Sequence, residues 1–169
     1  MDLRAMQRPL KERYRADPAA AAITLRATGT QAQAGVPVAC SVDLGRAVYE
    51  AQAHSGVGGA GTAACSGDLL LGALAAGAQL TCQMVAAALG VPTERLEVTV
   101  EGDLDLRGTL GVAKDVPAGF SAIRLRFDVT APNATPDQLA ALAERTERYC
   151  TVYQTLTQPP PIQTDWRTS

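Results

Sequence analysis

A long run without charge dominates the sequence. No charged side chain occurs between Asp68 and Glu94, and most of the residues between them are alanine and leucine, which have high helix propensity. Ser66 can cap a helix that starts here, and Asp68 places negative charge at the positive end of its dipole. The Gly-Val-Pro sequence at 90–92 is a typical helix end. The pattern predicts one helix over Ser66–Leu89, roughly 36 Å long at 1.5 Å per residue.

This helix is apolar on nearly every face, so we expect it to be buried with the rest of the chain wrapped around it. Its length would allow it to cross a membrane. The many alanines, the polar stretch at Gln79–Gln83 and the lack of a flanking cationic or aromatic girdle argue against that. Gly77 interrupts the helix and costs about 1 kcal/mol relative to alanine. Either a neighbour packs closely there, or a functional side chain has been lost.

The composition limits the classes of function. A chain of 169 residues predicts one domain, and we divide it into an arm (1–20), a main domain (21–158) and a tail (159–169). The net charge of -2 and the 4% aromatic content argue against nucleic acid or an anionic membrane surface as a partner. No stretch near the N-terminus is long enough for a secretory leader, which predicts the cytoplasm and reduced cysteines.

Neither a metal nor another cofactor is predicted. The chain has a single histidine, His54, and its cysteine spacings match no zinc pattern. The glycine-rich stretch His54–Gly61 lacks the lysine and the Ser/Thr of a phosphate loop. The four cysteines are Cys40, Cys65, Cys82 and Cys150. Cys40 and Cys82 are interpreted as small buried hydrophobic residues.

The other elements are predicted from alternation and turn residues. The predicted strands are Ile23–Thr28, Val38–Val42, Arg46–Ala53, Leu96–Glu101, Leu104–Val112, Ala122–Val129 and Val152–Leu156. A second helix follows the cap Thr135 and runs to about Tyr149, with Leu139, Leu142 and Ala143 predicted to face inward. The order of elements predicts an α+β fold, with an antiparallel sheet wrapped on the buried helix. The polar, basic arm is interpreted as packing on a partner subunit or as a partly ordered tail.

Four blocks of residues support a family resemblance. They are Cys65–Leu71 at the start of the central helix, His54–Gly61, Glu101–Gly111 and Thr146–Leu156. Together with the order of elements, they resemble the OsmC/Ohr family of osmotically induced and organic-hydroperoxide-resistance proteins. The resemblance covers about residues 20 to 158.

The resemblance implies a fold, an assembly and a chemistry. It implies an OsmC-like fold in an intertwined homodimer, with two active sites at the subunit interface. It also implies a cysteine peroxidase acting on organic hydroperoxides. One cysteine in the middle of the central helix attacks the peroxide, and a second, after the C-terminal helix, then forms a disulfide with it. A dithiol reductant resets the pair.

Carried over residue by residue, the resemblance places the second cysteine at Cys150 and the first at Gly77, which has no sulfur. The acidic residue near the helix start falls at Gly67, with Asp68 beside it. The matching blocks also supply possible pocket or supporting residues, which are Cys65, Asp68, His54, Glu101 and Arg107. Turn hydrogen bonds or surface ion pairs explain the last three more simply, and a structural role is the simpler explanation for Cys65.

No other cysteine reaches the position of Gly77 within one subunit. Cys82 lies about 7.5 Å further along the helix and roughly 140° around it, and Cys65 lies roughly 18 Å back. The sequence therefore leaves three hypotheses. The chain is a thiol-dependent hydroperoxide reductase scaffold that is inactive because of Gly77. Alternatively, it is a diverged, non-redox relative that binds or converts another small molecule in a dimer-interface pocket enlarged by Gly77. Or it has no site at all.

Overall fold

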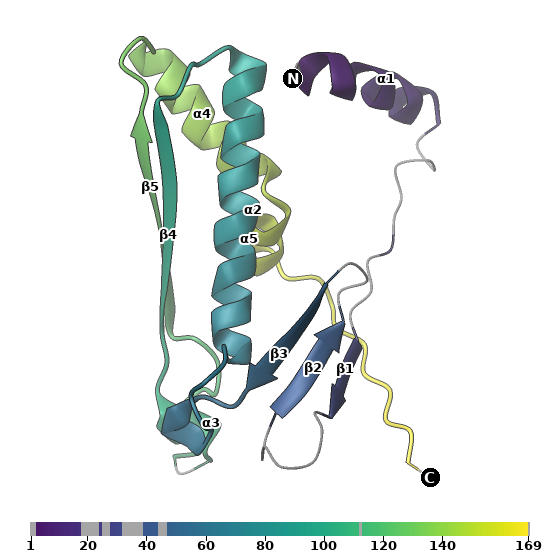
Figure 1. Ribbon diagram of the computed structural model, residues 1–169, viewed down its shortest axis with the longest axis vertical. Helices are drawn as coiled ribbons and strands as arrows, with labels where there is room; N and C mark the ends of the chain where they lie inside the picture. Colours follow the sequence, from purple (N-terminus) through teal and green to yellow (C-terminus); the bar gives the residue numbers. More distant parts are fainter. Residues whose placement is uncertain are drawn as a thin grey trace. The chain divides into compact units, whose positions relative to one another are not determined.

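The computed structural model describes residues 3–17, 24, 28–31, 39–43, 47–111 and 113–168. The chain divides into two compact units, one formed by the chain up to Gly72 and by Thr99–Arg126, the other by Ala73–Val98 and the chain from Phe127 onward. The elements, drawn in Figure 1, are α1 (Leu3–Ala16), β1 (Thr28–Gln31), β2 (Ala39–Asp43), β3 (Val48–Gln52), the 3-10 turn η2 (Ser55–Val57), α2 (Ser66–Leu89), β4 (Arg95–Asp103), α3 (Leu106–Thr109), β5 (Ala122–Thr130), α4 (Pro136–Tyr149) and α5 (Thr151–Thr157).

The first unit contains a three-stranded antiparallel sheet in the order β1-β2-β3. Strands β2 and β3 form the predicted hairpin, with Cys40 opposite Ala51. The strand predicted at Ile23–Thr28 lies almost wholly outside the described residues, and β1 begins at Thr28. The predicted N-terminal arm contains the helix α1.

Helix α2 has the predicted bounds, but its N-terminal cap differs from the prediction. Ser66 is the first helical residue, and the carbonyl of Cys65 accepts the first helical hydrogen bond, from the Leu69 N–H at 3.0 Å. The carboxylate of Asp68 reaches back to accept the Cys65 N–H at 2.9 Å. Cys65 is therefore the N-cap, and the prediction for Ser66 was wrong by one residue. At the C-terminus Gly90 takes the expected left-handed conformation, with φ 69°.

The prediction that α2 is buried on nearly every face is wrong for the single chain. Its buried residues are Leu74, Ala78, Thr81, Cys82, Val85 and Ala86. These lie on one face, spaced by three and four residues as on an amphipathic helix. Leu80 and Met84 on another face are 59% and 40% exposed. By length and composition alone α2 could cross a membrane, a test that core helices of soluble proteins also pass.

The second unit holds the hydrophobic core. Its buried members are Cys82, Val85, Ala86, Val91 and Leu142. Strands β4 and β5 pair as an antiparallel ribbon, because the Glu94 N–H at one end donates to Thr130 and the Ser121 N–H at the other end donates to Asp103. The antiparallel sheet packs against the long helix (Figure 1), and the Gln79 side chain donates to the Leu96 carbonyl at 3.0 Å.

Two predicted strands are helices. Residues 106–109 form α3, because the Asp105 carboxylate accepts the Arg107 N–H at 3.0 Å and caps a helical turn. Residues 151–157 form α5, which starts directly after α4. The β-branched residues there favour a strand locally, but the Thr155 hydroxyl bonds back to the Thr151 carbonyl at 2.8 Å, as in a helix.

Helix α4 begins as predicted. The Thr135 hydroxyl accepts the Gln138 N–H, and the Gln138 side chain accepts the Thr135 N–H, which forms a capping box. Leu142 is buried as predicted. Leu139 and Ala143 are exposed instead of inward-facing, because they border an open apolar cavity rather than the closed core.

Candidate functional site

Gly77 and Cys150 face each other within the second unit. A β-carbon built on Gly77 would lie 3.4 Å from the Cys150 sulfur. Cys150 is 1% exposed and joins α4 to α5. The middle of α2 and the end of α4 therefore bring together the two positions that the resemblance singled out.

The Cys150 thiol also has a structural role. Its sulfur accepts the Tyr153 N–H at 3.5 Å, which makes Cys150 the N-cap of α5. Its own N–H donates to Thr146 at 3.0 Å, and its carbonyl accepts from Gln154 at 2.9 Å. One residue thus ends one helix and starts the next, and these bonds fix where its sulfur lies.

Val152 is the other neighbour of Gly77. The Cγ2 atom of Val152 would lie 3.1 Å from a β-carbon on Gly77, closer than ordinary van der Waals contact. The space that a side chain at position 77 would use is therefore partly filled by a branched residue with few rotamers. This packing gives little support to the hypothesis that Gly77 enlarges a ligand pocket.

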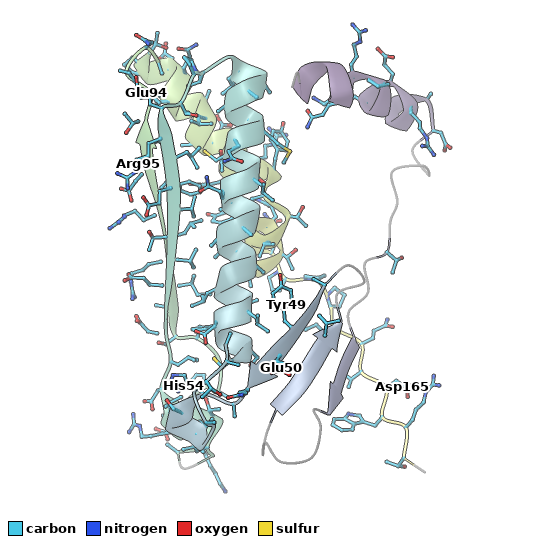
Figure 2. All side chains as sticks on the ribbon, in the orientation of Figure 1. Tyr49, Glu50, His54, Glu94, Arg95 and Asp165 are labelled. Atoms are coloured by element: carbon cyan, nitrogen blue, oxygen red, sulfur yellow. The ribbon has the colours of Figure 1, made fainter. Side chains whose placement is uncertain are left out.

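A cavity of about 240 Å³ in the first unit collects three other predicted residues, His54, Cys65 and Asp68. We call it the Cys65 cavity. Figure 2 shows His54 beside α3. Among the described residues, the cavity lining is His54, Cys65, Gly67, Asp68, Leu71, Gly102, Leu104, Leu106 and Phe120. The lining therefore combines a polar part, made of a thiol, an imidazole and a carboxylate, with an apolar part.

Hydrogen bonds orient the polar part of this lining. The His54 Nδ1 accepts the Gly56 N–H at 3.0 Å, which leaves Nε2 as the ring nitrogen that can donate a hydrogen bond. The Cys65 N–H and then the Cys65 thiol donate to Asp68, and these bonds hold the pKa of Asp68 below its ordinary value. The carboxylate therefore stays charged at neutral pH.

Glu101 and Arg107 lie outside this lining and form exposed ion pairs. Arg107 bonds through Nε and Nη2 to the Asp105 carboxylate, with Nε to Oδ1 at 3.0 Å. Glu101 accepts from Arg124 Nε at 3.2 Å, and Arg124 also binds Asp103. These contacts brace α3 and the β4–β5 ribbon at the surface, and their exposure makes them weak contributors to stability.

Cys82 is 2% exposed and belongs to the core, where burial raises the pKa of its thiol. It lines an apolar cavity of about 290 Å³ together with residues of β5 and α4, among them Phe127, Leu142 and Thr146. A buried thiol held in its protonated form is a poor nucleophile. Cys82 is therefore the small hydrophobic residue that the sequence predicted.

Sequence reasoning missed two apolar residues that shape these sites, Val152 and Phe120. Val152 was assigned to a strand, so its contact with Gly77 could not be foreseen. The Phe120 ring lies against Gly102, where a β-carbon would come 2.5 Å from its Cε1 atom. A glycine in β4 is a signal of close approach by another group, but it does not identify that group.

Comparisons with known proteins agree on one family. A family model described as OsmC-like protein matches residues 59–165. An OsmC-like protein from Mycoplasma pneumoniae is 16% identical with a TM-score of 0.62, covering 81% of this chain and 89% of that chain. An organic hydroperoxide resistance protein OsmC from Legionella pneumophila is 16% identical with a TM-score of 0.60, covering 80% and 90%. An organic hydroperoxide resistance protein from Elizabethkingia anophelis is 18% identical with a TM-score of 0.58, covering 82% of this chain and 90% of that chain. No curated protein gives a match.

Proposed function

Because the chain belongs to the family of OsmC-like proteins, we propose that it is a thiol-dependent hydroperoxide reductase scaffold that is catalytically silent. In this proposal Gly77 stands at the position of the peroxide-attacking cysteine and Cys150 is the remaining, resolving cysteine. Structures with this fold include organic hydroperoxide resistance proteins, and that reaction class comes to this chain as part of the proposal.

The distance between Gly77 and Cys150 is the observation that carries the proposal. A disulfide holds its two β-carbons about 3.5–4.5 Å apart, which requires each β-carbon to lie close to the opposite sulfur. The 3.4 Å from a β-carbon on Gly77 to the Cys150 sulfur is near that requirement. A cysteine at position 77 could therefore form a disulfide with Cys150 after a small adjustment.

The proposed chemistry needs both sulfur atoms. A thiolate at position 77 would attack the O–O bond of an organic hydroperoxide, becoming a sulfenic acid and releasing an alcohol once the leaving oxygen takes a proton. The Cys150 thiol would displace water from that sulfenic acid and form the disulfide. A dithiol reductant would return both thiols. With glycine at position 77 the first step has no nucleophile, and Cys150 is too buried to replace it.

Restoring the sulfur tests this proposal. We expect Gly77→Cys to gain hydroperoxide-dependent oxidation of a dithiol, and the unmodified chain to show none. Because Val152 crowds the position, we expect Gly77→Cys with Val152→Ala to react faster than Gly77→Cys alone.

Two controls accompany this experiment. Gly77→Ala adds a β-carbon without sulfur and should stay inactive, and adding Cys150→Ser to the Gly77→Cys protein should abolish turnover with the dithiol. The proposal is wrong if both Gly77→Cys and Gly77→Cys with Val152→Ala are folded and neither consumes an organic hydroperoxide.

We also propose that the protein is a homodimer that buries the exposed face of α2. Leu80 and Met84 lie on this face with Ala73 and Ala76, at the spacing of one apolar helical stripe. An apolar stripe that the single chain leaves in water is typical of a partner interface. Among the described residues, β4 and β5 pair only with each other. Each strand therefore has an unpaired edge that a second copy of the chain could cover.

A further inference from the structure

The Cys65 cavity shares no residue with the Gly77–Cys150 pair, and the proposed function does not use it. Its thiol differs from the other two whose surroundings are described. Cys65 is half-buried at the cavity wall, whereas Cys82 and Cys150 are buried. A reagent that enters the cavity can therefore reach a sulfur atom without unfolding the chain.

Apolar side chains of the cavity lining lie close to the Cys65 sulfur. A β-carbon on Gly67 would lie 3.5 Å from the Cys65 sulfur, 3.3 Å from Phe120 Cζ and 3.9 Å from Leu104 Cδ1. Position 67 is therefore enclosed by a thiol, an aromatic ring and a leucine, and even a methyl group there would require the Phe120 ring to move by a few tenths of an ångström. An apolar group bound in the adjoining cavity would contact the apolar part of its lining, which is Leu71, Leu104, Leu106 and Phe120.

The polar part of the lining sets the charge that the cavity accepts. Asp68 is hydrogen-bonded to Cys65 and its pKa is lowered, so that a negative charge lies beside the sulfur at neutral pH. An anionic group brought to Cys65 would meet this carboxylate, whereas a neutral or cationic one would not be repelled. At about 240 Å³ the cavity is somewhat smaller than ligand pockets of about 300–1,000 Å³, so only a small group fits it.

We propose that the Cys65 cavity is a thiol-exchange site for a small, apolar, uncharged or cationic disulfide. The Cys65 thiol gives its proton to water, and its thiolate attacks one sulfur of the disulfide. The bond between the two sulfurs of the reagent breaks as the bond from Cys65 forms. The other half leaves as a thiolate and takes up a proton. Cys65 is thereby oxidised to a mixed disulfide, and half of the reagent is reduced to a thiol.

Labelling with two aromatic disulfides tests the charge preference. Dithiodipyridine is uncharged near pH 8, and dithiobis(nitrobenzoate) is anionic. Each rate at Cys65, located by peptide mass in a Cys40→Ser background, is divided by the rate for the unfolded chain. We expect the normalised rate to be about fivefold higher for the uncharged reagent, the factor for one pair of unit charges about 4 Å apart in water. Asp68→Asn should remove this difference. Equal normalised rates for the two reagents in the unmodified protein would contradict the charge preference.

A matched pair of glycine variants tests the cavity itself. Gly67→Ala places a methyl group between the sulfur and Phe120, whereas Gly72→Ala on the same helix meets nothing within 4 Å. Both changes favour the helix, so loss of folding is not expected. We expect Gly67→Ala to slow labelling by dithiodipyridine several-fold and Gly72→Ala to leave it unchanged. Equal rates in both variants, or no mixed disulfide at Cys65, would overturn the proposal. Neither outcome depends on position 77.

Discussion

Two glycines in α2 carry the same helix penalty in different surroundings. A β-carbon on Gly72 would meet nothing within 4 Å, whereas one on Gly77 would lie 3.1 Å from Val152 Cγ2. The penalty at Gly72 follows from backbone entropy alone. At Gly77 the close approach of α5 adds a steric cost to any side chain. The effect of a substitution there on stability therefore depends on packing against Val152 as well as on helix propensity.

We expect Gly72→Ala to raise the free energy of unfolding by about 0.8–1 kcal/mol, the difference in helix propensity between the two residues. We expect Gly77→Ala to gain clearly less or to lose stability, because Val152 must move by a few tenths of an ångström. Urea unfolding of the two variants measures both values. Equal stabilisation at the two sites would show that Val152 yields without cost.

The sulfur of Cys150 is expected to stabilise α5 as its N-cap. Cys150→Ser keeps an acceptor for the Tyr153 N–H and should retain close to the stability of the unmodified chain. Cys150→Ala leaves that N–H without its cap and should cost about 0.5–1 kcal/mol. Denaturant unfolding of the pair separates the cap from the loss of the thiol, and equal stability of the two variants would argue against the capping role.

At the scale of the element, the contribution of Asp68 to the stability of the start of α2 depends on pH. Its hydrogen bonds from Cys65 lower its pKa in the folded state. A lowered pKa means that the contribution to stability is complete above the unfolded value of about 3.9 and is lost as the pH falls through the folded value. For an exposed carboxylate at a helix N-terminus the contribution is roughly 0.3–1 kcal/mol.

We therefore expect Asp68→Asn to be less stable than the unmodified chain by this amount near neutral pH. The difference should shrink as the pH falls below about 4, where both chains carry a neutral side chain at this position. Unfolding free energies measured across this range check the prediction. A difference that stays constant into the acid range would mean that the charge of Asp68 plays no part.

The elements differ in how far the sequence could predict them. The bounds of α2 follow from a charge-free run and a glycine stop, and β4, β5 and α4 follow from alternation and a capping residue. The segments at 106–109 and 151–157 were assigned to strands, because Asp105 and Cys150 act as caps only in the folded context. The burial of α2 was overestimated, since periodicity does not say how much of an apolar helix one chain can cover.

The candidate sites also include some features that the sequence predicts and others that only the tertiary structure reveals. Family resemblance singles out the positions of Gly77 and Cys150, and in the fold a β-carbon on Gly77 would lie 3.4 Å from the Cys150 sulfur. His54, Cys65 and Asp68 share a cavity, although nothing in their spacing required it. Val152 and Phe120 escaped notice because apolar residues reveal their role only through the contacts that the tertiary structure gives them.

At the scale of the whole molecule, the exposed stripe of α2 predicts assembly. We expect Leu80→Asp to convert the proposed homodimer into a monomer, because it places a charge in the apolar interface. Arg145→Glu changes charge on an exposed part of α4 and should leave the assembly intact. Sedimentation equilibrium distinguishes these states. A monomeric unmodified chain, or a Leu80→Asp variant that stays dimeric, would contradict the proposed interface.

The most direct test of the central claim is a disulfide map of the Gly77→Cys protein after one equivalent of an organic hydroperoxide. We predict one new disulfide, between the introduced thiol and Cys150, with one alcohol released for each disulfide formed. Oxidation that leaves Cys150 as a free thiol, or that joins the introduced thiol to another cysteine, would contradict the assignment of these two positions as a redox pair.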